Sequence, residues 1–289
     1  MLAWLPAALT IAADGGVRCR SRRPAARAAA LVNRGITHVP GIRVGHFTLT
    51  ERPTGCTVVL VDGDGAVGGV SQRGGAPGTR ETDLLDPLNM VDRVNAVVLS
   101  GGSAYGLDAA QGVVQVSRRA THRLERGAAG VVPIVPAAIL FDLGFGGDPK
   151  IRPTGGLRLQ GRDRGVERRR ARKATSARAP GATVGKLAAP ARAMKGGLGS
   201  ASIALPNGLI VGAIAAVNAA GDVVDPATGK VVAGVRTEDG KALADARMLI
   251  RSGAIGPARR PPRAGGNTTI AVVATNATPV EGRDEPHRR

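Results

Sequence analysis

Aromatic residues are scarce in this chain. Its 289 residues include three Phe, one Tyr and one Trp, which together make 2% of the composition. A chain of this length that is 43% hydrophobic can still bury a substantial core, in one large domain or at most two. That core must be built from Ala, Val, Leu and Ile packed around 42 glycines.

Cysteine and long apolar runs are also lacking. Cys19 and Cys56 have neither the spacing of metal ligands nor that of a disulfide framework, so we expect no metal site and a cytoplasmic protein. Residues 1–13 are apolar but too few to span a bilayer. Basic residues follow this run instead of preceding it, unlike in a secretory signal, and we expect no membrane association.

Acidic residues are outnumbered by basic ones, 22 against 40, which gives a formal net charge of +18. Most of the excess lies in two runs, one within residues 18–27 and the other within residues 151–178. Neither run carries the interleaved aromatic side chains on which nucleic-acid bases stack. This distribution favours solvated charge, and we expect no nucleic-acid partner.

From about residue 35 onward, apolar segments of strand length alternate with loops and helical patterns. A helix is predicted to begin near Ser103, because Leu107, Ala110 and Val113 recur with a spacing that gives one apolar face. Many Gly-rich strands combined with helices indicate an α/β sandwich with sheets inside. Strands are predicted at 36–46, 56–63, 66–71, 95–102, 131–135, 200–205, 209–217 and from Thr268 onward, with a polar loop at 74–87 and a hairpin turn at 206–208.

Residues 265–270, GGNTTI, place a hydroxyl side chain at the start of the last apolar strand. A hydroxyl group is a poor nucleophile near neutral pH, because its pKa is high and it keeps its proton. If the chain were cut just before Thr268, the freed α-amine, with a pKa of about 8, would serve as the general base of the same residue. Taken alone, the segment favours an ordinary strand that begins at Asn267 and Thr268, so the interpretation as a nucleophile depends on the other motifs.

Those motifs follow one another in a recognisable order. They are VPGIRVGH, GCTVVL, RGGAPGTRETDLL, VVLSGGSAYGLDAAQGV, VVPIVPAAILFDLG, GATVGKL, MKGGLGSASI, VGAIAAVNAAGDVVDP and NTTIAVVATNA. Over most of residues 35–277 the chain thus resembles the L-aminopeptidase/D-esterase (DmpA-like) family, which includes β-aminopeptidases and nylon-oligomer hydrolases. The resemblance implies an αββα four-layer sandwich of the DmpA/ornithine acetyltransferase type. It also implies a cofactor-independent hydrolase of small peptides, amides or esters that assembles as a homo-oligomer of processed protomers.

The same resemblance assigns roles to three residues. It implies autocleavage between Asn267 and Thr268, after which Thr268 is the N-terminal nucleophile. Asn218 matches the residue that polarises the scissile carbonyl, as an amide donor can. Lys186 matches a Lys that keeps the α-amine neutral and stabilises developing negative charge. Without the resemblance, Asn218 reads as a turn former and Lys186 as a surface residue.

The loop between the strand at 95–102 and the following helix is the predicted substrate site. Gly101, Gly102, Ser103 and Tyr105 lie at the substrate pocket if the resemblance holds, and N–H groups left free at the start of a helix can bind a carbonyl or an anion. Ser103 is also a suitable helix N-cap. Phe141 stands near the place where some relatives carry an active-site Tyr, so no hydroxyl is assigned there.

Two segments depart from the family pattern inside a predicted single domain at 35–289, which a disordered extension at 1–34 precedes. They are the Arg-rich segment 153–180 and the tail 278–289. One choice of codons for residues 172–181, read from the third base, gives the family-like string EGNVGAGAG, and deleting one base from codons for the tail gives TLSKAATNRIA. We therefore hypothesise frameshifts and a fold that is incomplete at its C-terminus. The alternatives left open are an inactive frameshifted remnant, a basic interaction protein and an ornithine-acetyltransferase-like acyltransferase.

Overall fold

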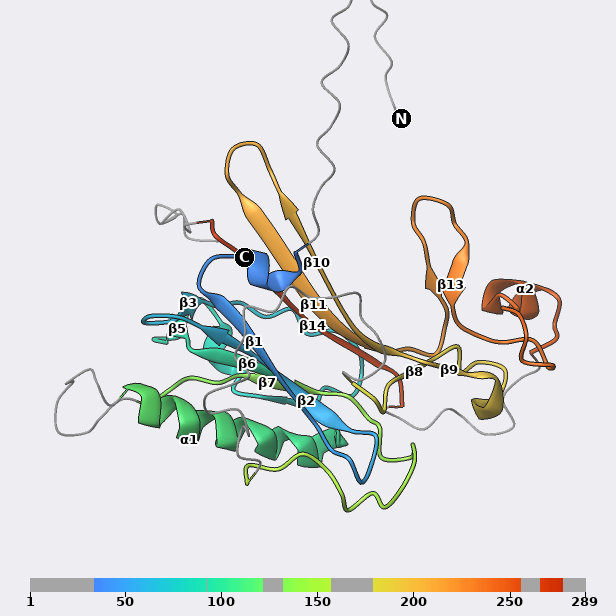
Figure 1. Ribbon diagram of the computed structural model, residues 1–289, viewed down its shortest axis with the longest axis horizontal. Coiled ribbons are helices and arrows are strands. Elements are labelled where there is room, and N and C mark those ends of the chain that lie inside the picture. The colour runs from blue at the N-terminus through green and yellow to red at the C-terminus, as the bar shows by residue number, and fades with distance from the viewer. Residues whose placement is uncertain (1–33, 92, 122–131, 157–178, 256–265, 278–289) are drawn as a thin grey trace, which may run out of the picture. The chain divides into compact units, whose positions relative to one another are not determined.

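The computed structural model describes residues 34–91, 93–121, 132–156, 179–255 and 266–277 (Figure 1). Nearly all of the N-terminal extension, most of the Arg-rich segment and the whole tail 278–289 lie outside these described residues. Every element discussed below belongs to one compact unit, Val32–Arg289. Within the described ranges, no helix has both the length and the apolar character needed to cross a membrane.

The larger sheet has five strands in the order β1-β2-β6-β7-β4. Neighbouring strands are antiparallel except β6 and β7, which are parallel. A parallel pair needs a crossover, and here it contains the 3-10 helix η3 (Ser103–Asp108) followed directly by helix α1 (Ala109–Thr121). The strands are β1 (Ile42–Thr48), β2 (Gly55–Val61), β4 (Thr79–Arg80), β6 (Ala96–Ser100) and β7 (Ala137–Ile139).

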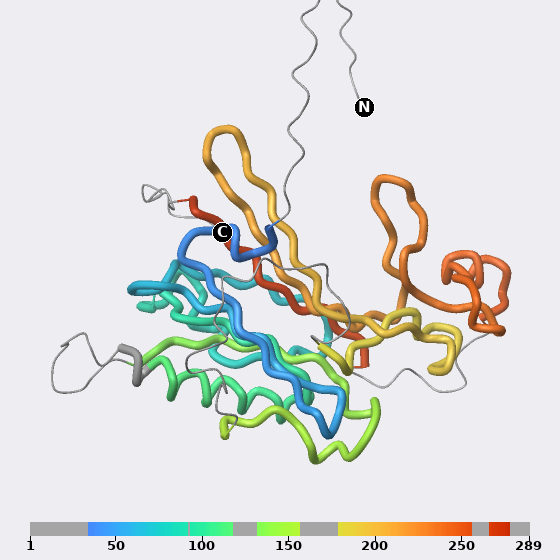
Figure 2. The backbone as a smooth tube through the Cα atoms, viewed as in Figure 1, coloured from blue at the N-terminus to red at the C-terminus, as the bar shows by residue number. Residues whose placement is uncertain are grey.

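The smaller sheet has three antiparallel strands in the order β10-β11-β14. Strands β10 (Gly197–Ala204) and β11 (Ile210–Asn218) form the predicted hairpin, which turns through Gly208 at φ +85°. Strand β14 (Thr268–Thr275) runs beside β11 along its length although the two are far apart in the sequence (Figure 2). The last predicted strand therefore starts at Thr268 as expected.

Two clusters of buried side chains join these elements into layers. Val58, Val98 and Ala137 of the larger sheet pack against Ala110 and Val113 of α1. The alternate residues of the same strands point the other way and pack against the smaller sheet, and this second cluster is made by Val59, Leu99, Leu140, Leu198, Ile214 and Ala216 with Ile270 and Val272. The predicted α/β sandwich is therefore present as a helix layer and two sheet layers, and only the larger sheet lies between two other layers among the described residues.

The outer face of the smaller sheet carries exposed apolar side chains, with Ile203 52% and Val273 67% exposed. The remaining elements are short. They are β3 (Ala66–Val67) paired with β5 (Arg93–Val94), β8 (Thr183–Val184) paired with β9 (Met194–Lys195), β12 (Val223–Val224) paired with β13 (Val231–Ala233), helix α2 (Ala246–Arg251) and the 3-10 helices η1 (Ile36–His38), η2 (Asp83–Leu85) and η4 (Pro190–Arg192).

Four element predictions were wrong in their limits. The segment 36–46 opens with η1, and β1 begins after Gly41, whose φ of +79° interrupts an extended chain. Residues 132–136 form no strand, because Pro133 and Pro136 lack the N–H that a sheet interior requires, and β7 starts one residue later. Of 66–71 only β3 is paired, and the loop 74–87 contains β4 and η2.

Candidate active site

The end of β11 and the start of β14 bring two predicted site residues together. In the antiparallel register Asn218 is the direct partner of Thr268. The residues face each other because the smaller sheet pairs the last position of one strand with the first position of the other. The structure thus places the proposed carbonyl-polarising amide beside the proposed nucleophile, and it leaves their chemical roles untested.

Asn218 is almost completely buried, at 1% exposure, and its amide is held from both sides. The Nδ2 group donates to the carbonyl oxygen of Phe141 at 2.9 Å and lies 3.4 Å from that of Gly266. Its Oδ1 accepts from the Thr183 backbone N–H at 3.1 Å and from Lys186 Nζ at 2.9 Å. Donors on one side and carbonyls on the other fix which end of the amide points toward Gly266.

Lys186 reaches the same place from the segment after β8. Its Nζ donates to Asn218 Oδ1, to the Asn218 carbonyl oxygen at 3.2 Å and to the Gly266 carbonyl oxygen at 2.7 Å. Burial lowers the pKa of the Lys186 ammonium from 10.5 to about 8, because the charged form loses solvation there. Near neutral pH this side chain can therefore serve both as a cation and, in part, as a neutral amine.

The carbonyl on which these donors converge is that of Gly266, one peptide before the Asn267–Thr268 bond. Lys186 Nζ and Asn218 Nδ2 approach that oxygen at 2.7 and 3.4 Å. Asn267 is exposed and Thr268 is partly buried. Lys186 and Asn218 thus polarise the carbonyl of Gly266, which lies next to the predicted cleavage site. Cleavage after Asn267 requires the same two donors to act on the Asn267 carbonyl instead.

The glycine-rich loop after β6 differs from its prediction. The N–H groups of Gly101, Gly102 and Ser103 donate to the Gly55 carbonyl at 2.9 Å, to Asp142 Oδ1 at 2.9 Å and to the Leu140 carbonyl at 3.1 Å. The expectation that these N–H groups are free for a ligand is therefore wrong, because β2 and the segment that follows β7 accept their hydrogen bonds. The assignment of Gly101, Gly102, Ser103 and Tyr105 to the substrate site remains a prediction.

Tyr105 is the exposed part of that loop, at 59%. The guanidinium of Arg152 stacks on its ring at 4.0 Å from the ring centre, as in a cation–π contact. Gly102 and Ser103 both have positive φ, +89° and +55°. For Ser103 this is an uncommon conformation, and such residues persist where the surroundings force them.

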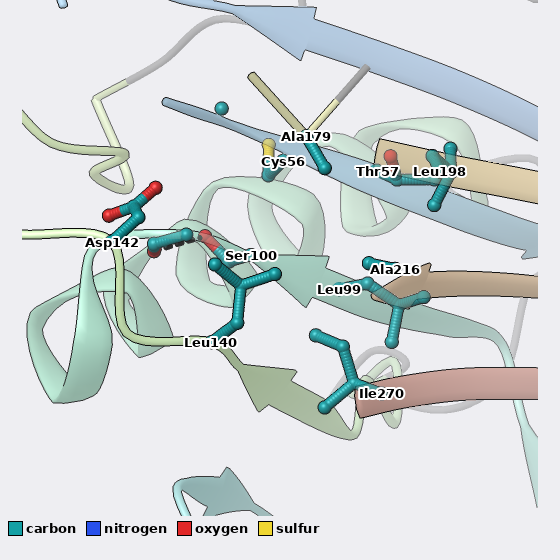
Figure 3. A pocket seen from close by; sticks show the side chains of 12 residues that line it. Cys56, Thr57, Leu99, Ser100, Leu140, Asp142, Ala179, Leu198, Ala216 and Ile270 are labelled. Carbon is teal, nitrogen blue, oxygen red and sulfur yellow. Dashed lines mark hydrogen bonds between the residues drawn. The ribbon is translucent and has the colours of Figure 1, made fainter. Parts of the chain in front are cut away.

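A cavity lies between the two sheets next to this region (Figure 3). It is lined on one side by Ser100, Gly101 and Asp142 and on the other by Ala216 and Ile270, two residues after Thr268. Cys56 also lines it, but burial raises the pKa of its thiol to about 11, so the thiol stays protonated and is a poor nucleophile. In the part of the chain that the structure describes, no group of three or more His, Cys, Asp or Glu side chains could hold a metal ion.

Sequence reasoning missed several groups that surround Asn218. The Phe141 carbonyl and the Thr183 N–H bond to Asn218, and the buried carboxylate of Asp142, next to Phe141, accepts the Gly102 N–H. A backbone carbonyl carries no signal in the sequence. Asp142 follows directly after the apolar segment 137–141, which is a detectable signal, because a charged residue buried after a strand needs a partner.

Comparison with known proteins bears on this site. The model of peptidase family S58 matches residues 34–283. An uncharacterized aminopeptidase of Mycobacterium tuberculosis is 49% identical over 209 residues, which are 67% of this chain and 55% of that protein. A 6-aminohexanoate-oligomer endohydrolase of Kocuria is 36% identical over 104 residues, which are 36% of this chain and 26% of that protein. The chain thus spans about half the length of the curated mycobacterial relatives it matches.

A crystal structure of a protein from Pyrococcus horikoshii has the same fold. It superposes with a TM-score of 0.57 at 18% identity, over 84% of this chain and 64% of that one. The family model begins at Arg34, next to the predicted boundary at residue 35, and extends beyond Thr268. The sequence resemblance is therefore confirmed, and the chain belongs to peptidase family S58.

Proposed function

We propose that this chain is a self-processing N-terminal-nucleophile hydrolase that is cut between Asn267 and Thr268. Thr268 then cleaves small peptides or amino-acid amides and esters. The observation that carries the proposal is the convergence of Lys186 and Asn218 on the Gly266 carbonyl, with Asn218 paired to Thr268. The names of the relatives, an aminopeptidase and an oligomer endohydrolase, agree with hydrolysis of amide bonds.

In the proposed self-cleavage, Thr268 Oγ attacks the carbonyl carbon of Asn267 and loses its proton to a base. The C–N bond breaks and the nitrogen takes up a proton, so the acyl group moves from N to O and leaves an ester with a free α-amine on Thr268. Water then hydrolyses the ester, which gives a carboxylate on Asn267 and restores the hydroxyl. Lys186, with its lowered pKa, is the nearby group suited to take the first proton.

In the proposed turnover, the α-amine of Thr268 is the base and Oγ again attacks. The substrate carbonyl becomes an acyl ester on Thr268, the amine leaves with a proton, and water releases the acid. Protonated Lys186 favours the neutral form of the α-amine through like-charge repulsion. The Nδ2 group of Asn218 has a long contact with the Gly266 carbonyl. Once this contact is released, Nδ2 can donate to the oxyanion as an uncharged donor.

The test compares Thr268→Ala with Thr268→Ser. The unmodified chain of 29.3 kDa should yield two fragments by intact mass, the smaller beginning at Thr268, and should hydrolyse an L-aminoacyl p-nitroanilide. Thr268→Ala should stay intact and be inactive, whereas Thr268→Ser retains a hydroxyl and should process. Substrate hydrolysis by Thr268→Ala would refute the assignment of Thr268 as the nucleophile. Acetyl transfer to glutamate without peptide hydrolysis would instead support the acyltransferase reading.

A further inference from the structure

A complete ion pair lies inside the protein close to the candidate active site. The side chains of Arg52 and Asp142 are 0% and 2% exposed, and Arg52 Nη2 lies 3.1 Å from Asp142 Oδ1. The guanidinium also donates to the carbonyl oxygens of Gly146 at 3.2 Å, of Ile151 at 3.1 Å and of Asp142 itself. Both charges are thus fully enclosed by protein partners, and Arg52 is the largest completely buried side chain.

The carboxylate of this pair holds the glycine loop. Asp142 Oδ1 accepts the N–H of Gly102, and Oδ2 accepts the hydroxyl of Thr54 at 2.6 Å. A side chain at Gly101 would collide with Asp142 Oδ2 and Thr54 Oγ1, so the carboxylate can approach only because residue 101 is glycine. The left-handed conformations of Gly102 and Ser103 follow directly after this contact.

The same short segment also holds Asn218. Phe141, the neighbour of Asp142, accepts the hydrogen bond from Asn218 Nδ2 at 2.9 Å. Two consecutive residues therefore connect the glycine loop on one side with the amide that faces Thr268 on the other. Any shift of this segment must move the loop and the amide together.

We infer that Arg52, Asp142 and Thr54 are positioning residues that set the glycine loop at the substrate side of the site and anchor the segment bonded to Asn218. The inference rests on the proposed function, which it extends by three residues that do not touch the reacting atoms. Buried ion pairs add little stability compared with apolar packing. The carboxylate of this pair holds Gly102, directly before Ser103 with its uncommon φ of +55°, so the pair is better explained by the geometry that it imposes.

The test removes a single hydroxyl. Thr54→Val deletes the hydrogen bond to Asp142 and keeps the ion pair, Thr54→Ser restores the hydroxyl, and Thr54→Ala repeats the deletion with a smaller side chain. Ser202→Ala is the matched control, because it removes a buried hydroxyl that does not line the cavity and is bonded to His38 at 3.1 Å. The readouts are hydrogen exchange of the Gly102 N–H and the KM and kcat for an L-aminoacyl p-nitroanilide.

Thr54→Val and Thr54→Ala should exchange the Gly102 N–H about tenfold faster and raise KM about tenfold with a smaller change in kcat, as expected for one lost hydrogen bond to a charged group. Thr54→Ser should behave like the unmodified protein, and Ser202→Ala should change neither readout. Unchanged exchange at Gly102, an unchanged KM, or effects of Ser202→Ala as large as those of Thr54→Ala would overturn the inference. If the unmodified chain neither processes nor hydrolyses, the proposed function fails, while the exchange data still decide whether Thr54 and Asp142 hold the loop.

Discussion

The two sheets differ in how completely their faces are covered. The central strands β2 and β6 of the larger sheet are buried on both sides, with Val58 and Val98 under α1 and Val59 and Leu99 against the smaller sheet. The smaller sheet is covered on one side, and along β14 partly buried residues alternate with exposed ones from Thr268 to Thr275. The larger sheet is therefore the region in which packing fixes position most strongly.

The predicted reactive groups lie on the less covered sheet. Asn218 and Thr268 occupy the paired ends of β11 and β14, while the carbonyl of Phe141, which accepts a hydrogen bond from the Asn218 amide, follows β7 of the larger sheet. The predicted reactive amide on one layer is thus oriented by a segment of the better-packed layer. This division predicts that the free energy of unfolding depends mainly on the larger sheet. It also predicts that catalytic activity depends on the contact between the larger and the smaller sheet.

The largest effect is expected when the buried ion pair is broken. Arg52→Met leaves the Asp142 carboxylate enclosed without its partner and should lower the free energy of unfolding by about 3–5 kcal/mol, measured by urea titration. The control is Arg43→Met, whose pair with Asp62 is about half exposed and should contribute at most about 1 kcal/mol. If Arg52→Met and Arg43→Met lowered the free energy of unfolding equally, the buried pair of Arg52 and Asp142 would have no special role in stability.

A smaller effect should distinguish the two sheets directly. Val98→Ala in β6 removes two methyl groups from a fully buried site and should cost about 2 kcal/mol in unfolding free energy. Val273→Ala in β14 makes the same change at a site that is 67% exposed, where about 0.5 kcal/mol is typical. If Val273→Ala cost as much as Val98→Ala, the outer face of the smaller sheet would have to be covered in solution.

Much of this arrangement could be predicted from local patterns. Apolar runs identified β2, β6, β11 and β14, and helical spacing identified α1, because these features depend on residues close in sequence. The motifs also identified Asn218, Lys186 and Thr268. The patterns failed where prolines at 133 and 136 moved β7, and where a short 3-10 turn replaced the start of a predicted strand at 36–38.

The contacts within the site could not be predicted in the same way. The N–H groups of the glycine loop were expected to be free, yet their acceptors come from residues 55, 140 and 142, which only the folded sheet brings near. The burial of Arg52 was equally invisible, because an isolated Arg in a polar segment looks like a surface residue. Sequence motifs thus singled out residues that the fold brings together, and long-range contacts determined what surrounds them.

The last prediction concerns Lys186, which is partly buried, and the pH dependence of stability. Its pKa is about 8 in the folded protein and near 10.5 when unfolded, so between these values the unfolded chain binds more protons and unfolding free energy should rise with pH. Lys186→Met should lose that rise, whereas Lys241→Met at an exposed site should keep it. Urea titrations from pH 7 to 11, on a Thr268→Ala background that keeps the chain uncut, measure the slope. An identical slope in the presence and absence of Lys186 would mean that its ammonium is not desolvated beside Asn218, and the proton-accepting role proposed for it would fail.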